Sequence, residues 1–233
     1  MKFFVILFFL TLCSILSAST RLGIVESFVG NVKVKSDGSI KKSRVFVGLE
    51  IKEGDLITTA KKANAKIKLL DGSILILDAS SLLHFTSGSD VEQEGGKIFY
   101  KIISRNSKNA LKIKTPFAII GIKGTTFIIS AGKDSSVTLK EGLIEVSSIK
   151  EEFELYRQKI KAEFNDYKFK QEKEYEKYLN AQNSYENVKK TRKFDLREKY
   201  SVSFVGTRVN EKIWSTKDNT EFKYFEQLSN NRK

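Results

Sequence analysis

The residue types that most often carry out catalysis are scarce in this chain. Its 233 residues include one histidine, His84, and one cysteine, Cys13. A Cys/His zinc site, a Cys–His nucleophile pair and a Ser-His-Asp triad all draw on these two residue types. The sequence therefore predicts a protein that is not an enzyme, with no catalytic residues, no cofactor and no metal.

Aspartates are the other residues whose positions could support chemistry. Asp55, Asp71 and Asp78 lie at predicted turns. Carboxylates that converge in a cleft can hold a sugar or act as acid and base, but nothing in their spacing brings these three together. A carbohydrate-binding envelope protein, which would need such a cleft, is for this reason only the second alternative function.

A glycine-rich segment, Gly121-Ile122-Lys123-Gly124-Thr125, has some likeness to a phosphate-binding loop. It lacks the Gly-Lys-Ser/Thr ending of such a loop, and no helix is predicted after it. We interpret the segment as a place where the backbone passes close to a neighbour before a strand at residues 126–129.

The chain is basic, with 41 Lys and Arg against 28 Asp and Glu, a net charge of +13. Of the 41 basic residues, 33 are lysines, whose hydrated point charge is poorly suited to bidentate recognition. The basic residues are spread along the chain and form no concentrated arm. We therefore expect no nucleic acid among the partners, and an AT-rich genome would also explain the lysine content.

The first 18 residues are predicted to be a signal peptide. A short basic start, Met1-Lys2, precedes the apolar run Phe3–Leu12, and cleavage is expected after Ala18. The protein is therefore expected in the periplasm. Contact with a membrane would come only through an uncleaved signal or through a lipidated Cys13, against which Leu12 in the preceding position argues.

Residues 21–149 have the pattern of a β-domain. Short alternating or apolar runs recur about every ten residues between glycines, which is typical of a sandwich, barrel or β-solenoid. Turn chemistry supports this reading: Asp71-Gly72 separates two apolar runs, and Pro116 favours an extended Thr115 at a strand end. The residues predicted to serve the fold rather than chemistry are Gly30, Gly54, Asp55, Asp71, Gly72, Ser73, Pro116, Gly121, Gly124, Thr125, Phe127 and Gly142.

The order and spacing of several motifs resemble the FecR domain family over about residues 24–148. The motifs are Gly30-Asn31-Val32, Leu49 to Asp55 with Thr58-Thr59, Ala65 to Ser73, Thr115-Pro116, Gly124 to Phe127 and Glu141 to Val146. The resemblance implies an all-β periplasmic domain, β-solenoid-like or two-layered, that makes protein contacts. In the regulators that name the family, this domain receives a signal from an outer-membrane siderophore receptor and relays it to a sigma factor. Those regulators begin with a cytoplasmic anti-sigma segment and a membrane helix, whereas here a signal peptide leads directly into the domain.

Residues 150–199 predict one long helix. The segment is rich in Glu, Lys, Gln and Tyr and has no Gly or Pro. Apolar and aromatic side chains recur at steps of three and four, partly with an eleven-residue period. Tyrosine is common at interfaces, so the stripe could contact a partner, a second copy or the β-domain, or it could be one face of a solvated strut. The interface candidates are Phe153, Tyr156, Phe164, Tyr167, Tyr175, Tyr178 and Tyr185.

The last segment, residues 200–233, predicts a tail with a short strand and a helix. Trp214, Phe222, Phe225 and Leu228 offer too much apolar surface to remain bare. We expect the tail to fold back as core, and a partner-binding tail is the alternative.

Together these patterns predict an α+β chain: a mainly β FecR-like domain, a long charged helix and a short returning tail. The favoured function is a non-catalytic exported envelope protein whose FecR-like domain binds another protein, with the helix as a spacer or assembly element. Its partner would be another envelope or periplasmic protein, or a second copy. The first alternative is a periplasmic sensor or regulator in transmembrane signal transduction.

Overall fold

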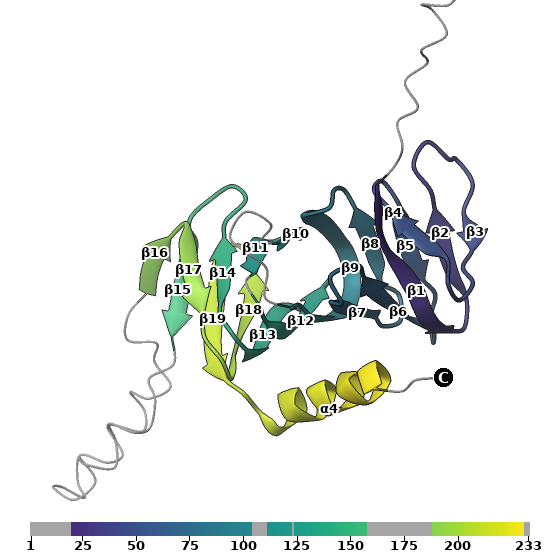
Figure 1. Ribbon diagram of the computed structural model, residues 1–233. Coiled ribbons are helices and arrows are strands. Elements are labelled where there is room, and N and C mark those ends of the chain that lie inside the picture. The colour runs from purple at the N-terminus through teal and green to yellow at the C-terminus, as the bar shows by residue number, and fades with distance from the viewer. Residues whose placement is uncertain (1–19, 104–110, 123, 158–187, 231–233) are drawn as a thin grey trace, which may run out of the picture.

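The computed structural model describes residues 20–103, 111–122, 124–157 and 188–230. These residues form nineteen strands and one helix, α4 (Thr216–Asn230) (Figure 1). The predicted mainly β chain is confirmed. The predicted signal peptide, its cleavage site at Ala18 and Cys13 lie outside the described residues.

The strands form two layers, which we name sheet A and sheet B. Sheet A runs in the order β4 (Glu50–Lys52), β1 (Arg21–Val29), β6 (Asn64–Leu69), β7 (Ile74–Leu77), β9 (Asp90–Lys101), β12 (Thr126–Ala131), β13 (Ser135–Glu141), β18 (Tyr200–Val205), β19 (Arg208–Ile213), β15 (Phe153–Arg157) and β16 (Val188–Thr191). Sheet B runs in the order β3 (Ser43–Arg44), β2 (Val32–Lys35), β5 (Leu56–Thr59), β8 (Leu82–Phe85), β9, β10 (Leu111–Lys114), β11 (Ile119–Ile122), β14 (Ile144–Ser147) and β17 (Lys193–Leu196).

Strand β9 belongs to both sheets. Its first half pairs with β8 and β10 in sheet B, and its second half pairs with β7 and β12 in sheet A. All nineteen strands therefore form one mixed sheet that folds over on itself without closing. The bend needs Gly96, whose φ is +80°, because a side chain there would collide with the backbone of Ser81.

A buried polar network supports this bend. The Tyr100 hydroxyl donates to Oε1 of Gln93 at 2.9 Å. Nε2 of Gln93 donates to the carbonyl oxygens of Gly96 and Ile129 at 3.0 and 3.2 Å. All of the Gln93 side chain's polar groups are thus paired, which removes the penalty of burying an amide between the sheets.

One apolar core lies between the two sheets. Alternation along the strands produces it: in β13, Val137 and Leu139 point inward, while Ser136, Thr138 and Lys140 lie on the other face. Residues from both sheets belong to this single cluster, including Tyr100 and Phe127, whose rings stack at 4.9 Å. The FecR resemblance implied a β-solenoid-like or a two-layered domain, and the structure has two layers.

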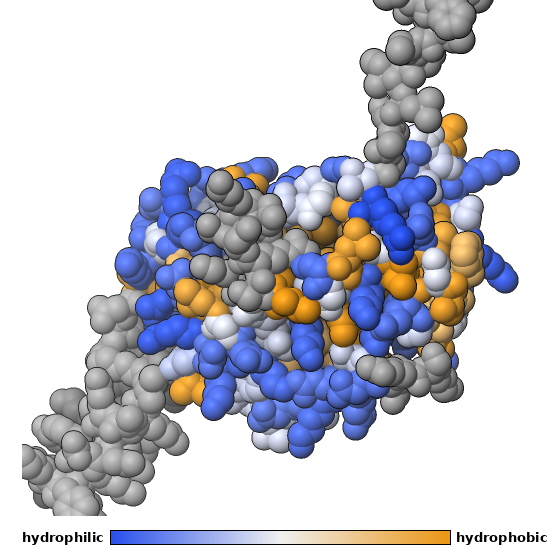
Figure 2. Space-filling model, viewed as in Figure 1, coloured by the Kyte–Doolittle hydropathy of each residue, from blue (hydrophilic) through white to orange (hydrophobic). Residues whose placement is uncertain are grey.

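Helix α4 covers the outer face of sheet A. Phe222 and Phe225 form a second apolar cluster with Ile76, Phe99 and Ile128. The helix begins at a capping box, in which Ser215 N and Oγ both donate to the Asp218 carboxylate at 2.6 Å. The solvent-facing side of α4, at the bottom of Figure 2, is mostly hydrophilic. The C-terminal tail thus returns to the β-domain and packs as core.

Lysines from sheet A hold the helix in place. Lys97 pairs with Glu221, Lys140 pairs with Glu226, and the buried Lys66 ammonium donates to the Ser229 carbonyl oxygen. This last contact neutralises the C-terminal end of the helix dipole. No helix among the described residues is long and apolar enough to cross a membrane.

The predicted helix at residues 150–199 is wrong at both of its ends. Phe153–Arg157 forms β15, and Val188–Thr191 and Lys193–Leu196 form β16 and β17. Phe153, Leu155, Phe194 and Leu196 alternate into the core, and pairing with β19 and β14 outweighs the helix propensity of the surrounding sequence. Residues 158–187, which include most of the predicted helix, lie outside the described residues.

Candidate protein-binding cleft

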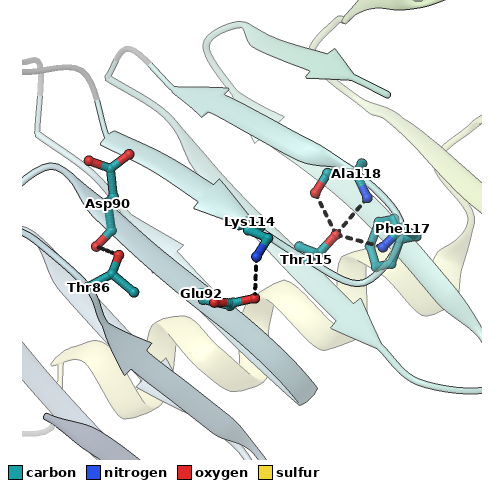
Figure 3. Close-up of polar contacts among 7 residues, drawn as sticks. All are labelled: Thr86, Asp90, Glu92, Lys114, Thr115, Phe117 and Ala118. Carbon is teal, nitrogen blue, oxygen red and sulfur yellow. Dashed lines mark hydrogen bonds and ion pairs between the residues drawn. The ribbon is translucent and has the colours of Figure 1, made fainter. Parts of the chain in front are cut away.

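A tight turn between β10 and β11 is built around Thr115 and Pro116. The Thr115 hydroxyl donates to the Ala118 carbonyl oxygen at 2.8 Å (Figure 3). It also accepts hydrogen bonds from the N–H groups of Phe117 and Ala118, at 3.3 and 2.9 Å. These bonds order the turn locally, so Phe117 has a defined position at the end of sheet B.

The strand before this turn is anchored to β9. Lys114 Nζ lies 2.9 Å from Oε1 of Glu92, its partner in the parallel β9–β10 pair (Figure 3). Pro116 lacks an N–H, so it suits a turn at the end of a strand better than the strand interior. The turn is therefore held by both backbone geometry and a side-chain ion pair.

Phe117 reaches across to sheet A. Its ring centroid lies 4.5 Å from that of Phe204 on β18. Phe204 also contacts Phe153 on β15 at 5.8 Å, and Phe153 contacts Phe194 on β17 at 5.7 Å. Four aromatic rings from both sheets thus close one end of the core.

A cleft of about 630 Å³ opens over this aromatic cluster. Phe117, Phe153 and Phe204 line it, and turns from both sheets form its rim. Val205 and Ile149 at the cleft are 70% and 39% exposed. Lys133, Lys150 and Glu151 add charge around it. An apolar base with a charged rim suits a protein partner that inserts an apolar side chain.

The residues predicted to serve the fold do not converge on this cleft, apart from Pro116. Asp71 accepts hydrogen bonds from Ser73 N and Oγ at 2.9 Å, and Asp55 accepts one from Lys52 N at 2.8 Å. Phe127 is in the core. The glycines of the set with positive φ are Gly30, Gly54, Gly72, Gly124 and Gly142.

Gly142 and Gly124 occupy one crossing of the backbone. A Cβ at Gly142, where φ is +94°, would lie 2.6 Å from the Gly124 carbonyl oxygen and from Cγ2 of Thr125. Thr125 is itself buried. Gly121 differs from them, because a Cβ there would lie 3.7 Å from Glu145, an ordinary contact. The close backbone approach predicted for the segment from Gly121 to Thr125 is therefore found at Gly124 and Thr125, and Gly121 has no part in it.

The predicted aromatic interface is only partly described. Phe153 is buried in the core, so it is not a free contact residue, although it lines the cleft. Tyr156 is half-buried on β15, and the Arg208 guanidinium lies over its ring at 4.4 Å. The other predicted interface residues, Phe164, Tyr167, Tyr175, Tyr178 and Tyr185, lie outside the described residues.

The candidates for chemistry come from different strands and turns. Asp55 precedes β5, Asp71 lies between β6 and β7, Asp78 follows β7, and His84 is on β8. Within the described ranges, no group of three or more His, Cys, Asp or Glu side chains is placed to hold a metal ion.

One acidic side chain is buried at the far end of sheet A. Glu211 on β19 has a 2% exposed side chain, and its Oε2 lies 2.7 Å from Nε of Arg157. Its Oε1 has no hydrogen-bond partner among the described residues. Burial raises the pKa of the Glu211 carboxyl above its usual value, against the opposing effect of Arg157 and Arg197.

Neither Phe117 nor Phe204 was predicted from the sequence as a functional residue. The Thr115-Pro116 pair marked a turn but not the aromatic residue after it. Phe117 and Phe204 are far apart in the sequence, and no local pattern pairs them.

The family model described as FecR protein matches residues 55–145. This stretch of the chain is therefore similar to FecR domains. The match runs from the turn before β5 into the first half of β14, so it includes the Thr115–Pro116 turn and Phe117. The resemblance inferred from sequence motifs is thereby confirmed.

Among solved structures, two crystal structures of a "putative anti-sigma factor" from Parabacteroides distasonis ATCC 8503 are similar to this chain. Each has a TM-score of 0.48 and 14% sequence identity over 72% of this chain. The similarity covers 63% of those chains, which is less than two thirds of their length. No curated protein matches the sequence.

Proposed function

We propose that this protein is an exported, non-catalytic regulator that takes part in signal transduction through protein contacts of its FecR domain. The FecR match over residues 55–145 carries the proposal. In the regulators that name the family, this domain receives a signal from one protein and passes it to another. The apolar run Phe3–Leu12 supports export to the periplasm.

The aromatic cleft is the proposed contact site. It lies where turns of both sheets meet, and turns tolerate variation that strands in a core do not. Its exposed Val205 and the partly buried Phe117 offer apolar surface next to charged rim residues. A partner strand or loop with one apolar anchor would bury this surface.

Photo-crosslinking in intact cells tests the proposal. A photoreactive residue replaces Val205 in the full chain, and in a matched variant it replaces Val29, which is 60% exposed at the end of β1. We expect a partner to crosslink at position 205 and not at position 29. Mass spectrometry then identifies the partner.

The identity of the crosslinked protein distinguishes a signalling function from a structural one. A receptor or an inner-membrane regulator supports the signalling function. If the crosslinked protein is an envelope assembly component, or only a second copy of this chain, the signalling function is refuted and the domain has a structural role. Equal crosslinking at positions 205 and 29 would refute the cleft as the contact site.

A further inference from the structure

A second pocket, of about 260 Å³, lies between the outer face of sheet A and the beginning of α4. Cross-strand pairing builds its floor. Thr138 on β13 pairs with Ser201 on β18, and Ser201 pairs with Lys212 on β19. A neighbouring row consists of Ser130 on β12, Ser136 on β13 and Ser203 on β18.

These side chains face α4 because of strand alternation. In β18, Val202 and Phe204 point into the core, so Ser201 and Ser203 lie on the opposite face. The wall of the pocket comes from Ser215, Lys217, Asp218 and Glu221 at the start of the helix. The sheet therefore lines the pocket with hydroxyl groups and two lysines, Lys97 and Lys212, and the start of the helix adds further charged groups.

The buried hydroxyl of Ser201 points to a ligand. Its side chain is on the pocket floor and the residue is only 2% exposed. Its Oγ has no hydrogen-bond partner among the described residues. Buried hydroxyls are normally paired, because an unpaired one loses its hydrogen bonds to water without replacement.

The charges around the pocket favour a neutral ligand. Lys97, Lys212 and Lys217 face Asp134, Asp218 and Glu221, three basic groups against three acidic ones. Lys97 already pairs with Glu221, and Asp218 already caps the helix at Ser215. An anion would therefore meet carboxylates, and a cation would meet ammonium groups.

The pocket chemistry matches a molecule with several hydroxyl groups. Ser and Thr hydroxyls donate and accept, carboxylates accept, and ammonium groups donate. The volume equals that of about nine water molecules at about 30 Å³ each, which suits a ligand smaller than a typical drug. We propose that this pocket binds a small neutral polyhydroxylated ligand of the monosaccharide class.

The single tryptophan provides a readout. Trp214 directly precedes Ser215 of the pocket wall, and its ring stacks on Phe222 of α4 at 4.8 Å. A ligand that bridges the sheet and the helix would change the surroundings of this ring. It would also raise the thermal midpoint, because it binds only the folded protein.

The experiment titrates the full chain with D-glucose, D-galactose and N-acetylglucosamine, each at millimolar concentrations, and follows Trp214 fluorescence and the thermal midpoint. Inorganic phosphate is titrated in parallel. Two variants remove one floor hydroxyl each, Ser201→Ala and Thr138→Val. The matched control is Ser27→Ala on β1, away from the pocket.

We expect saturable binding of at least one sugar, weakened about tenfold by Ser201→Ala and by Thr138→Val and unchanged by Ser27→Ala. Circular dichroism and the thermal midpoint without ligand establish that each variant is folded. The proposal is overturned if no sugar gives a saturable change, if the floor variants bind as the unaltered protein does, or if phosphate binds and the sugars do not.

Discussion

Phe117 of sheet B and Phe204 of sheet A lie with their ring centroids 4.5 Å apart. This contact closes the core at one end and forms the base of the proposed contact cleft. In the proposed function the same two rings would serve both stability and recognition, so a test of recognition must use a residue that the core does not need. Val205 meets that requirement, because it borders the cleft and is largely exposed.

Phe204→Ala is expected to destabilise the protein by about 3–5 kcal/mol, because it leaves a cavity beside the rings of Phe117 and Phe153. Urea unfolding followed by circular dichroism measures the change. Val205→Ala, at the next position, serves as the control and should change stability by less than about 0.5 kcal/mol. Equal effects of the two substitutions would mean that the aromatic cluster does not hold the sheets together.

Gly142→Ala should lower stability strongly, because the new Cβ would collide with the Gly124 carbonyl oxygen at a residue with φ of +94°. Strain of this kind costs about 1–3 kcal/mol before the collision is relieved. Gly121→Ala is the matched control, since its Cβ would make only an ordinary contact. Thermal unfolding compares the two, and a Gly142→Ala midpoint equal to that of Gly121→Ala would contradict the prediction.

Replacement of residues 158–187 by a short Asn-Gly turn should leave the β-domain folded. Tyr156 and Val188 are direct partners in the antiparallel β15–β16 pair, so a tight turn can join these strands. We expect a thermal midpoint within about 5 °C of that of the full chain. Loss of cooperative unfolding would show that the removed residues contribute to the core. If the shortened protein folds but no longer captures its partner, the tyrosine-rich segment is an interface.

The buried Glu211 carboxyl should make stability depend on pH. Its pKa is raised in the folded state, so the folded protein binds this proton more tightly than the unfolded chain does. Stability contributed by the protonated form is lost as pH rises from the usual glutamate pKa through the raised value. Glu211→Gln does not titrate, so its stability relative to the unaltered protein should increase across that window and then level off.

Urea unfolding at a series of pH values from about 4 to about 8 measures this difference. Glu154→Gln on the neighbouring strand β15 controls for the loss of one negative charge. A stability difference for Glu211→Gln that stays constant over the series would refute the assignment.

Local patterns predicted the β-domain well, because alternation and turn residues act over a few positions. Asp71 and Ser73 close their turn through hydrogen bonds that span two residues, as the Asp-Gly pair suggested. The mainly β class and the FecR family followed from such local signals. The return of the tail was predicted because its aromatic residues offer too much apolar surface to stay in water. Phe222 and Phe225 are indeed buried in the second apolar cluster.

Features that depend on distant partners could not be predicted. Leu155 joins a strand because Val209 of β19 lies beside it, although the surrounding residues favour a helix. The cleft needs Phe117 and Phe204 together, and the second pocket needs Ser201, Thr138 and the start of α4 together. None of these residues is unusual in its own sequence neighbourhood. Their meeting is a consequence of the order of strands in the sheets.

Strand β9 has a mechanical consequence for the domain. Because one continuous backbone is hydrogen-bonded into both layers, neither layer can peel away without breaking pairs in the other. A pulling force applied at the cleft end would reach the strands around Val25 and Ile57 through this shared element rather than through side-chain packing alone. The domain should therefore resist tension as a single unit.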